Sequence, residues 1–324
     1  MFFILYLLSF LVGVIGAWLI STFAFKWGLM DRPNERSSHY RPTPKGGGIG
    51  ILAAFLISSL LVGIPHAFWI TASILAIFSF FVDKNDLSPK TRLPLHFLAA
   101  FAILAFVLEN NNGGPSFVPI LVFMAIFIVG TANFYNFMDG INGIAAITGI
   151  VVFGLFAIYM TFASIDRPFI QLSICIALSC LGFLPFNMPS AKVFMGDVGS
   201  ILLGFVFAGM VVIISKGFLD FICLASFLFP FYADELTTMV VRIKDRENLL
   251  HPHRRHLYQL LANEKEIDHW KVSIGYGVFQ LLVGISVIAL KLYGIIVILT
   301  ILALYFLAFS LVSYNVRKNV AARA

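Results

Sequence analysis

Long apolar runs alternate with short polar stretches along the whole chain of 324 residues. A helix that crosses a lipid bilayer needs about 20 apolar residues, and most of these runs are close to that length. They predict eleven membrane-spanning helices, at residues 2–25, 47–64, 66–82, 93–109, 117–138, 144–163, 169–186, 199–215, 219–241, 271–290 and 294–313. We therefore expect an all-α, polytopic integral membrane protein in which residues 1–324 form a single transmembrane domain.

The composition supports this fold class. Hydrophobic residues make up 60% of the chain, charged residues make up 12%, and the mean hydropathy is +0.95. A soluble domain of this length could not bury so much apolar surface. Cys175, Cys180 and Cys223 lie inside apolar runs, so we expect them to pack there without forming disulfides.

The basic residues fall on one side of the predicted spans. Nineteen of the 22 lysines and arginines lie in the segments 26–45, 83–92, 187–198, 242–271 and 314–324. Basic loops face the cytoplasm, so the N-terminus is expected outside, in the periplasm, and the C-terminus in the cytoplasm. The net charge of +6 then reflects topology, and we expect no nucleic-acid partner. The first apolar run lacks a basic region before it and is interpreted as an uncleaved span.

The first two basic loops contain candidate binding groups. Lys45 precedes Gly46, Gly47 and Gly48, and glycines let backbone N–H groups approach a phosphate at a helix N-terminus. Taken alone, this loop favours the simpler alternative of a flexible helix entry with a basic anchor. Asp83 directly follows an apolar run, so its carboxylate would lie at the membrane surface. There it could accept a proton or bind a cation, or it could belong to a solvated loop of mixed charge.

A polar stripe ends the fifth predicted span. Asn133, Asn136 and Asp139 are three residues apart and share one helix face, and Gly140 and Gly143 then permit a sharp break. Polar side chains inside a membrane are energetically costly, so three on one face usually line a site. The alternative is a hydrogen-bonded seam between helices that serves packing alone. We favour the site.

A lone carboxylate begins the eighth predicted span. Asp197 lies among small residues at the start of this apolar run. Hard oxygen ligands of this kind suit Mg²⁺, which binds through few protein carboxylates and keeps contacts with water and phosphate. An aspartate at a helix start is also a common cap, and both roles are compatible.

The basic segment 242–271 contains a cluster of three histidines and two arginines within six residues: His251, His253, Arg254, Arg255 and His256. Because a guanidinium next to a metal is unfavourable, this mixture suits phosphate binding better than metal binding. A basic patch at the membrane surface is the alternative. Two acids of the ninth span, Asp234 and Glu235, are candidates for pairing with Arg242 or with the histidines.

Four motifs, in order along the chain, resemble those of the polyprenyl-phosphate N-acetylhexosamine-1-phosphate transferase family. They are Pro-Thr-Pro-Lys-Gly-Gly-Gly at 42–48, Asn-x-x-Asn-x-x-Asp-Gly at 133–140, Ala-Lys-Val-Phe-Met-Gly-Asp at 191–197 and His-Arg-x-His-x-Tyr-Gln at 253–259. The last motif, with Arg-Ser-Ser-His at 36–39, is more similar to the O-antigen-initiating branch than to the peptidoglycan branch.

The resemblance implies a reaction and its partners. A sugar-1-phosphate would move from a UDP-sugar to a polyprenyl phosphate, expected to be undecaprenyl phosphate, with release of UMP. The expected donor is UDP-GlcNAc or a 6-deoxy-HexNAc nucleotide, and the expected cofactor is Mg²⁺, with Mn²⁺ as an alternative. Membrane lipid and a second copy of the chain are further candidate partners. The site would lie on the cytoplasmic face of the bacterial inner membrane, in loops near 26–48, 83–92, 133–143, 187–199 and 242–270.

The resemblance also implies roles for single residues. Asp197 matches the Mg²⁺-binding aspartate, Phe194 the aromatic residue that stacks on uracil, and Asn187 an asparagine of the nucleotide site. Catalytic roles are expected for Asp83, Asp139, His253 and His256. Substrate binding is expected of Lys45, Asn136, Asn142, Asn187, Phe194, Arg254 and Arg255.

Two positions depart from the family pattern. Val82 stands where the first acid of an Asp-Asp pair is expected, with Asp86 as a nearby substitute, and Asn142 replaces the second acid of Asp-Gly-x-Asp-Gly. Asparagine can hydrogen-bond a uracil edge, but it carries no charge. A catalytically impaired relative is therefore one alternative, and a membrane transporter built on broken spans is another. Asp83, which is retained, is expected to act as the base toward the lipid phosphate.

Overall fold

The computed structural model describes residues 2–33, 38–85, 91–111, 118–164, 167–248 and 253–322. These residues are mainly helical, and the predicted all-α class is confirmed. The helices are α1 (Phe2–Trp27), α2 (Ile49–Val62), α3 (His66–Lys84), α4 (Leu93–Asn111), α5 (Val118–Phe137), α6 (Ile144–Phe162), α7 (Arg167–Asn187), α8 (Asp197–Ile214), α9 (Phe218–Ala225), α10 (Phe229–Lys244), α11 (Leu257–Gln259), α12 (His269–Leu290) and α13 (Ile295–Ala321). Three short turns, η3 (Ser226–Leu228), η4 (Leu260–Glu264) and η5 (Lys291–Tyr293), and two strands, β1 (Met30–Asp31) and β2 (Thr43–Pro44), complete the set.

Every predicted span coincides with helix, but the ninth is broken. The run at 219–241 forms α9 and α10, separated by η3, and Pro230 lies in the first turn of α10. Proline lacks a backbone N–H and is therefore tolerated where a helix begins. Within the described residues, eight helices are long and apolar enough to cross a membrane, and α2 and the Leu93–Glu109 stretch of α4 are apolar but shorter. The polytopic membrane fold is confirmed, while the number of spans remains a prediction.

Helix α8 occupies the centre of the bundle, with 89% of its residues buried. A helix that is apolar on all sides is stable only when other helices surround it. Small residues bring those neighbours close: a Cβ on Gly204 would lie 2.9 Å from the Cα of Ala132 on α5. Helix α13 is the opposite case, because only 11% of its apolar window is buried. It therefore presents most of its apolar surface to the outside of the bundle.

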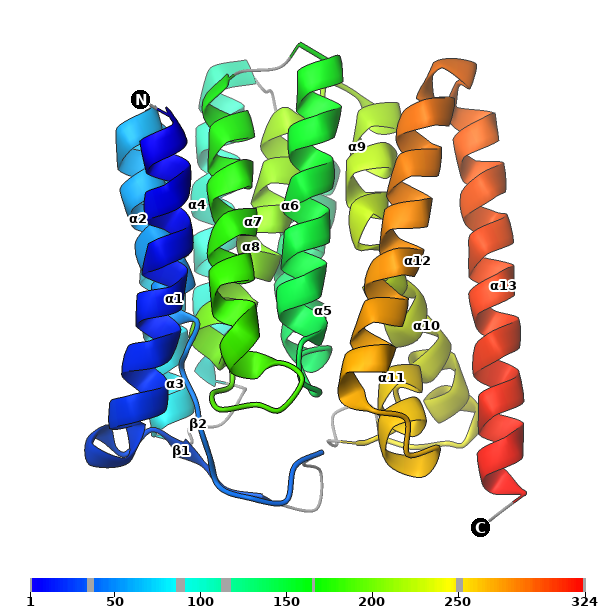
Figure 1. Ribbon diagram of the computed structural model, residues 1–324. Helices are drawn as coiled ribbons and strands as arrows, with labels where there is room; N and C mark the ends of the chain where they lie inside the picture. Colours follow the sequence, from blue (N-terminus) through cyan, green and yellow to red (C-terminus); the bar gives the residue numbers. More distant parts are fainter. Residues whose placement is uncertain are drawn as a thin grey trace.

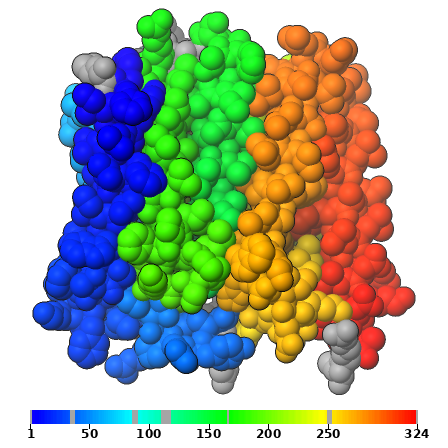
Figure 2. Space-filling view, in the orientation of Figure 1, coloured from blue at the N-terminus to red at the C-terminus, as the bar shows by residue number. Residues whose placement is uncertain are grey.

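The two ends of the bundle differ in their connections. The strands, α11 and the turns that follow α5 and α7 lie at one end, together with the C-terminus, and the N-terminus lies at the other (Figure 1). The two strands pair antiparallel, with Met30 opposite Pro44 and Asp31 opposite Thr43. The chain after α1 lies along this end, where its blue atoms are beneath the green part of the molecule (Figure 2). We call it the loop end.

Candidate functional site

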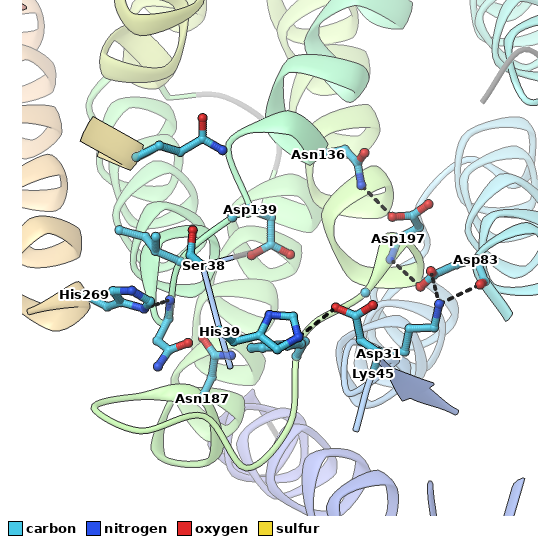
Figure 3. A pocket seen from close by; sticks show the side chains of 16 residues that line it. Asp31, Ser38, His39, Lys45, Asp83, Asn136, Asp139, Asn187, Asp197 and His269 are labelled. Carbon is cyan, nitrogen blue, oxygen red and sulfur yellow. Dashed lines mark hydrogen bonds and ion pairs between the residues drawn. The ribbon is translucent and has the colours of Figure 1, made fainter. Parts of the chain in front are cut away.

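A polar cavity of about 260 Å³ lies at the loop end, and each of the five predicted loop segments contributes to its wall. The lining residues are Asp31, Ser38, His39, Lys45, Asp83, Asn136, Asp139, Gly140, Ile141, Asn142, Asn187, Phe194, Gly196, Asp197, Gln259 and His269 (Figure 3). The structure thus brings together eight of the twelve predicted site residues, Lys45, Asp83, Asn136, Asp139, Asn142, Asn187, Phe194 and Asp197.

Backbone pairing brings the triple-glycine loop beside the start of α8. The Gly47 N–H donates to the Phe194 carbonyl, and the Gly48 N–H donates to the Met195 carbonyl, each over 2.9 Å. A Cβ on Gly48 would lie 2.5 Å from the Cα of Gly199. These glycines therefore permit close contact between α2 and α8. Their N–H groups at positions 47 and 48 bind the chain itself, so they are not held ready for a phosphate.

Two ion pairs stand side by side at one wall of the cavity. The Lys45 Nζ donates to Oδ1 and to the carbonyl of Asp83, each over 2.8 Å. Arg92 contacts Oδ2 of Asp197, and the Asn136 Nδ2 donates to Oδ1 of Asp197 over 2.8 Å. The Asp197 N–H lies 3.4 Å from Oδ2 of Asp83, which joins the two pairs (Figure 3). The wall therefore holds two adjacent carboxylates, each balanced by a cation of the chain.

The backbone at the start of α8 aims Asp197 at this wall. Helix α8 begins at Asp197 itself, and its N-cap is Gly196, with φ +70°, a conformation that favours glycine. A Cβ on Gly196 would lie 2.9 Å from the Gly46 nitrogen, so space also requires glycine there. The alternative that Asp197 is the helix cap is therefore wrong, and its carboxylate serves the cavity wall.

Asp139 lies in the turn between α5 and α6, and its carboxylate points into the cavity (Figure 3). Burial raises the pKa of Asp139, and the negative charge of Asp83 raises it further. The adjacent Gly140 packs against Tyr258, because a Cβ at this position would lie 2.2 Å from the tyrosine hydroxyl oxygen. The Asp-Gly pair thus combines a buried acid with a close contact that only glycine permits.

The predicted polar stripe divides between two roles. Asn136 and Asp139 line the cavity. Asn133, one turn earlier, contacts Nδ1 of His96 on α4 over 3.2 Å and donates to the Val129 carbonyl over 2.7 Å. For Asn133 the packing alternative is therefore correct, whereas the other two residues are placed for binding.

Two asparagines connect the loops around the cavity. Oδ1 of Asn187 accepts the Gly143 N–H over 2.6 Å, and its Nδ2 donates to the Val193 carbonyl over 2.9 Å. The Asn142 Nδ2 donates to the Pro189 carbonyl over 3.2 Å. These amides fix the loop geometry in addition to lining the cavity. Their contact with a nucleotide remains a prediction.

Phe194 offers an aromatic surface at the cavity wall. The ring of His39 meets it edge-on, with 4.8 Å between ring centroids. Both residues also line an adjoining groove of about 800 Å³, which includes Trp270 and Asn263. The Asn263 Nδ2 donates to Oγ of Ser38 over 3.1 Å, which ties the first loop to η4. An aromatic face next to polar groups suits a stacked base that is also hydrogen-bonded.

Four predicted residues do not line this cavity in the part of the chain that the structure describes: His253, Arg254, Arg255 and His256. Arg255 pairs with Asp245 and Glu247 near the surface. Burial, together with the nearby His256, lowers the pKa of His253 to about 4. The catalytic and binding roles of these four residues remain predictions.

His256 is buried beside two acids of α10. Its Nδ1 lies 3.8 Å from Oδ1 of Asp234, and its Nε2 lies 3.7 Å from Oε1 of Glu235. Burial opposes a charge on the imidazole, but the two carboxylates raise the pKa of His256 overall. Of the two pairings proposed for these acids, the structure shows the one with a histidine, while Arg242 instead donates to Glu247 over 2.9 Å.

Several cavity groups were not predicted from the sequence: Asp31, Ser38, His39, Ile141, Gln259 and His269. Arg92, which contacts Asp197, was also missed. A signal existed for His269, because it is a polar residue at the entry of a span, and its Nδ1 accepts the Asn142 N–H over 3.3 Å. Asp86 and Arg36, which the sequence singled out, lie outside the described residues.

The carboxylate wall suits Mg²⁺. This ion prefers oxygen ligands and usually binds through one or two carboxylates, with phosphate and water completing its shell. Asp83 and Asp197 supply carboxylates that face the same cavity. Among the described residues, no group of three or more His, Cys, Asp or Glu side chains could hold a metal. Because Arg92 contacts Asp197 and Lys45 contacts Asp83, an ion bound at Asp197 would displace Arg92 and take its remaining ligands from substrate and solvent.

The chain was also compared with known proteins. Residues 66–215 match the model of glycosyl transferase family 4. The chain is 31% identical over 279 residues to the undecaprenyl-phosphate alpha-N-acetylglucosaminyl 1-phosphate transferase of Thermotoga maritima, covering 86% of this chain and 87% of that protein. It is 27% identical over 309 residues, 88% of this chain and 84% of that protein, to a probable undecaprenyl-phosphate N-acetylglucosaminyl 1-phosphate transferase of Bacillus subtilis. It is 26% identical over 302 residues, 81% of this chain and 92% of that protein, to the phospho-N-acetylmuramoyl-pentapeptide-transferase of Staphylococcus saprophyticus.

Proposed function

This chain belongs to the polyprenyl-phosphate N-acetylhexosamine-1-phosphate transferases of glycosyl transferase family 4, and we propose that it catalyses such a transfer. It moves an N-acetylhexosamine-1-phosphate from a UDP-sugar to undecaprenyl phosphate, and it releases UMP. One observation carries the proposal: Asp83, Asp139 and Asp197 face one cavity with Lys45 and Phe194, at one end of a membrane bundle. There a lipid phosphate and a soluble nucleotide can meet.

The proposed step is a phosphoryl transfer. An oxygen of the lipid phosphate attacks the β-phosphorus of the UDP-sugar, and the bond from that phosphorus to the oxygen bridging both phosphates breaks. UMP leaves with the bridging oxygen, and the lipid carries the new diphosphate link. When bound at Asp197, Mg²⁺ would offset the negative charge of the phosphates.

The side chains of the cavity have separate tasks in this proposal. Phe194 holds the uracil by stacking. Lys45, already within 2.8 Å of a carboxylate oxygen, adds positive charge where the two phosphates approach each other. We assign Asp83 as the base toward a protonated lipid phosphate, because its Oδ2 faces the cavity and accepts only a long bond of 3.4 Å from the Asp197 N–H.

The relatives guide the choice of substrates. Two of them are named for transfer of N-acetylglucosaminyl 1-phosphate with undecaprenyl phosphate as the lipid. UDP-GlcNAc is therefore the first donor to test, followed by 6-deoxy-HexNAc nucleotides. We place the enzyme in the bacterial inner membrane, with the loop end in the cytoplasm, at the start of an O-antigen or another cell-envelope polysaccharide. Mg²⁺ is the proposed cofactor.

One assay tests this function. Purified protein is incubated with undecaprenyl phosphate, Mg²⁺ and a panel of UDP-sugars, and UMP release is measured. We expect UMP with at least one UDP-HexNAc, and a loss of roughly 100-fold or more in Asp197→Ala. Glu109→Ala, which changes an exposed acid at the far end of α4, is the matched control and should keep full activity. UMP release that persists in Asp197→Ala would refute the metal assignment.

A transporter is the second candidate, and the location of the polar residues argues against it. Transport sites usually lie near the membrane midplane, between corresponding halves of the chain. Here the polar residues of the cavity gather at the loop end (Figure 1). A protein that moved UDP-sugar into proteoliposomes without releasing UMP would support the transporter. A catalytically impaired relative would neither release UMP nor transport UDP-sugar.

A further inference from the structure

Asp234 is a fully buried acid outside the cavity wall, and it accepts four hydrogen bonds. Its donors are the Leu257 N–H at 2.7 Å, the Tyr258 N–H at 3.2 Å, the Tyr276 hydroxyl at 2.7 Å and the Thr238 hydroxyl at 3.2 Å. A buried carboxylate is stable only when such donors surround it. Asp234 therefore joins α10, α11 and α12 at a single point.

Two of these four donors begin helix α11. The first N–H groups of a helix have no partner within the helix and need an acceptor from elsewhere. A capping box between His256 and Gln259 closes the start of α11, and the Gln259 Oε1 accepts the His256 N–H over 3.3 Å. The Leu257 and Tyr258 N–H groups are bound by Asp234 of α10, 23 residues before Leu257, so the position of this short helix depends on that carboxylate as well.

Helix α11 in turn contacts the Asp139 turn through Tyr258. The Tyr258 hydroxyl donates to the Phe137 carbonyl over 2.9 Å, two residues before Asp139. The same hydroxyl oxygen would lie 2.2 Å from a Cβ on Gly140, one residue after it. Tyr258 is completely buried, so its ring has little freedom to move away. One side chain thus touches the backbone on both sides of Asp139.

We infer that Asp234 and Tyr258 form one positioning unit for the transfer reaction: Asp234 fixes α11, and Tyr258 fixes the turn that aims Asp139 into the cavity. The inference rests on the proposed function, because it gives Asp139 a part in the reaction. It also gives α11, whose Gln259 lines the cavity, a second task. Through Tyr258, α11 supports the turn that contains Asp139, and this role does not depend on what the basic residues of the loop bind.

A double-mutant cycle between Gly140→Ala and Tyr258→Phe tests the contact. Gly140→Ala should lower kcat roughly 10- to 100-fold, because the new Cβ pushes the turn away from the tyrosine hydroxyl. Tyr258→Phe removes one hydrogen bond and should lower kcat about two- to tenfold, with KM for the UDP-sugar little changed. In the double variant the closest contact, with the hydroxyl oxygen, is gone, while the ring carbon Cζ would still lie 3.0 Å from the Cβ, so kcat should recover in part, about threefold over Gly140→Ala alone.

The rescue separates positioning from general destabilisation. Two destabilising changes at independent places would add, and the double variant would then be worse than either single one. Gly130→Ala is the matched control: a Cβ there meets nothing within 4 Å, so it should show no coupling with Tyr258→Phe. Additive losses in the Gly140 cycle would overturn the inference.

Asp234→Asn tests the other end of the unit. The amide keeps the shape of the carboxylate but turns one acceptor into a donor that faces other donors. We expect kcat to fall at least about tenfold, and to fall much less when Tyr258→Phe is already present, since both changes act through one contact. Tyr276→Phe, which removes one of the four donors, is the milder variant if Asp234→Asn fails to fold. Full activity in both variants would sink the inference.

The same cycles can be measured in melting temperature, which requires no activity. If the wild-type protein releases no UMP, the proposed function fails. The Gly140–Tyr258 coupling would still be seen in the melting temperatures, and its absence there would count against the contact itself.

Discussion

At the scale of single residues, His39 is the cavity group with the clearest unassigned role. Its ring meets Phe194 edge-on, and its Nε2 is buried without a hydrogen-bond partner in the described structure, 3.6 Å from Oδ2 of Asp31. A buried nitrogen beside the proposed uracil surface is well placed to bind the base or the ribose. We expect His39→Ala to raise KM for the UDP-sugar about three- to tenfold, measured as initial rates of UMP release.

The control for His39 is its neighbour Tyr40, which is 94% exposed. Tyr40→Ala should change KM less than His39→Ala does, because Tyr40 lines only the adjoining groove and not the cavity wall. A lower KM in His39→Ala would mean that the imidazole occupies the place of the base and must move aside. An unchanged KM would mean that Phe194 holds the base without it.

The ionisation of Asp139 should make the transfer reaction depend on pH. Burial and the charge of Asp83 raise the pKa of Asp139, so this acid stays protonated at pH values where an ordinary aspartate, with a pKa of about 3.9, has ionised. If transfer uses the ionised form, kcat/KM for UMP release should rise with pH over a range well above that value. In Asp83→Asn the residual activity should show this rise at lower pH, because a neighbouring negative charge is removed.

Two observations would contradict this prediction. The first is a rate that is independent of pH down to the ordinary aspartate range, which would mean that Asp139 ionises normally or takes no part. The second is a rise in kcat/KM at the same pH in Asp83→Asn as in the wild-type protein, which would mean that another group titrates. Melting temperatures recorded at each pH serve as the control for loss of folded protein.

At the scale of helices, the contact between the starts of α2 and α8 sets the spacing of the two ion pairs. The backbone of Gly48 has φ −62°, which alanine adopts freely, so the close contacts with Gly199 and the Met195 carbonyl oppose a side chain there. We expect Gly48→Ala to destabilise the protein by about 1–3 kcal/mol and to reduce UMP release, because Asp197 moves relative to Lys45. Thermal unfolding and the transfer assay measure the two effects.

Gly154→Ala provides the comparison for Gly48→Ala. Gly154 lies inside α6, and a Cβ there meets nothing within 4 Å. Alanine favours helix over glycine, so this change should be neutral or slightly stabilising. Equal destabilisation by both changes would show that glycine flexibility matters and that the close contact does not.

The helices were largely predictable, because the length and hydrophobicity of an apolar run are local properties of the chain. The break in the ninth span was not. Residues 219–241 read as one apolar run, and Pro230 could equally have kinked a helix or begun one. The short strands were also missed, since a pairing of Met30 with Pro44 depends on residues far apart in sequence.

The site was predictable in part for the same reason. Asp83, Asp139 and Asp197 stand at span ends and in motifs, where sequence alone marks them. His39 lies in a motif and His269 at the entry of a span, but their partners, Phe194 and Asn142, are in separate segments that a local pattern does not identify. The basic loop suggested a place in the cavity for its histidines. The structure instead buries His256 beside Asp234 and Glu235 of α10, which is one of the two pairings expected for these acids.

At the scale of the whole molecule, charge is concentrated at the loop end, and the far end balances its few charges locally. Lys291 is one of three basic residues outside the five basic segments. Its Nζ lies 2.6 Å from Oδ1 of Asp220, which also accepts the Tyr159 hydroxyl over 2.9 Å. A paired lysine adds little to the positive charge that orients a membrane protein, so this exception is compatible with the proposed topology.

The orientation can be tested with two single cysteines at opposite ends of the bundle. Tyr40 at the loop end and Leu292 at the far end are 94% and 95% exposed, and the three native cysteines are buried, so background labelling should be low. Because basic loops stay in the cytoplasm, a membrane-impermeant maleimide should label Leu292→Cys in intact spheroplasts. It should label Tyr40→Cys only after the membrane is permeabilised. Labelling of Tyr40→Cys in intact spheroplasts would place the cavity outside, away from cytoplasmic UDP-sugars, and would refute both the topology and the proposed function.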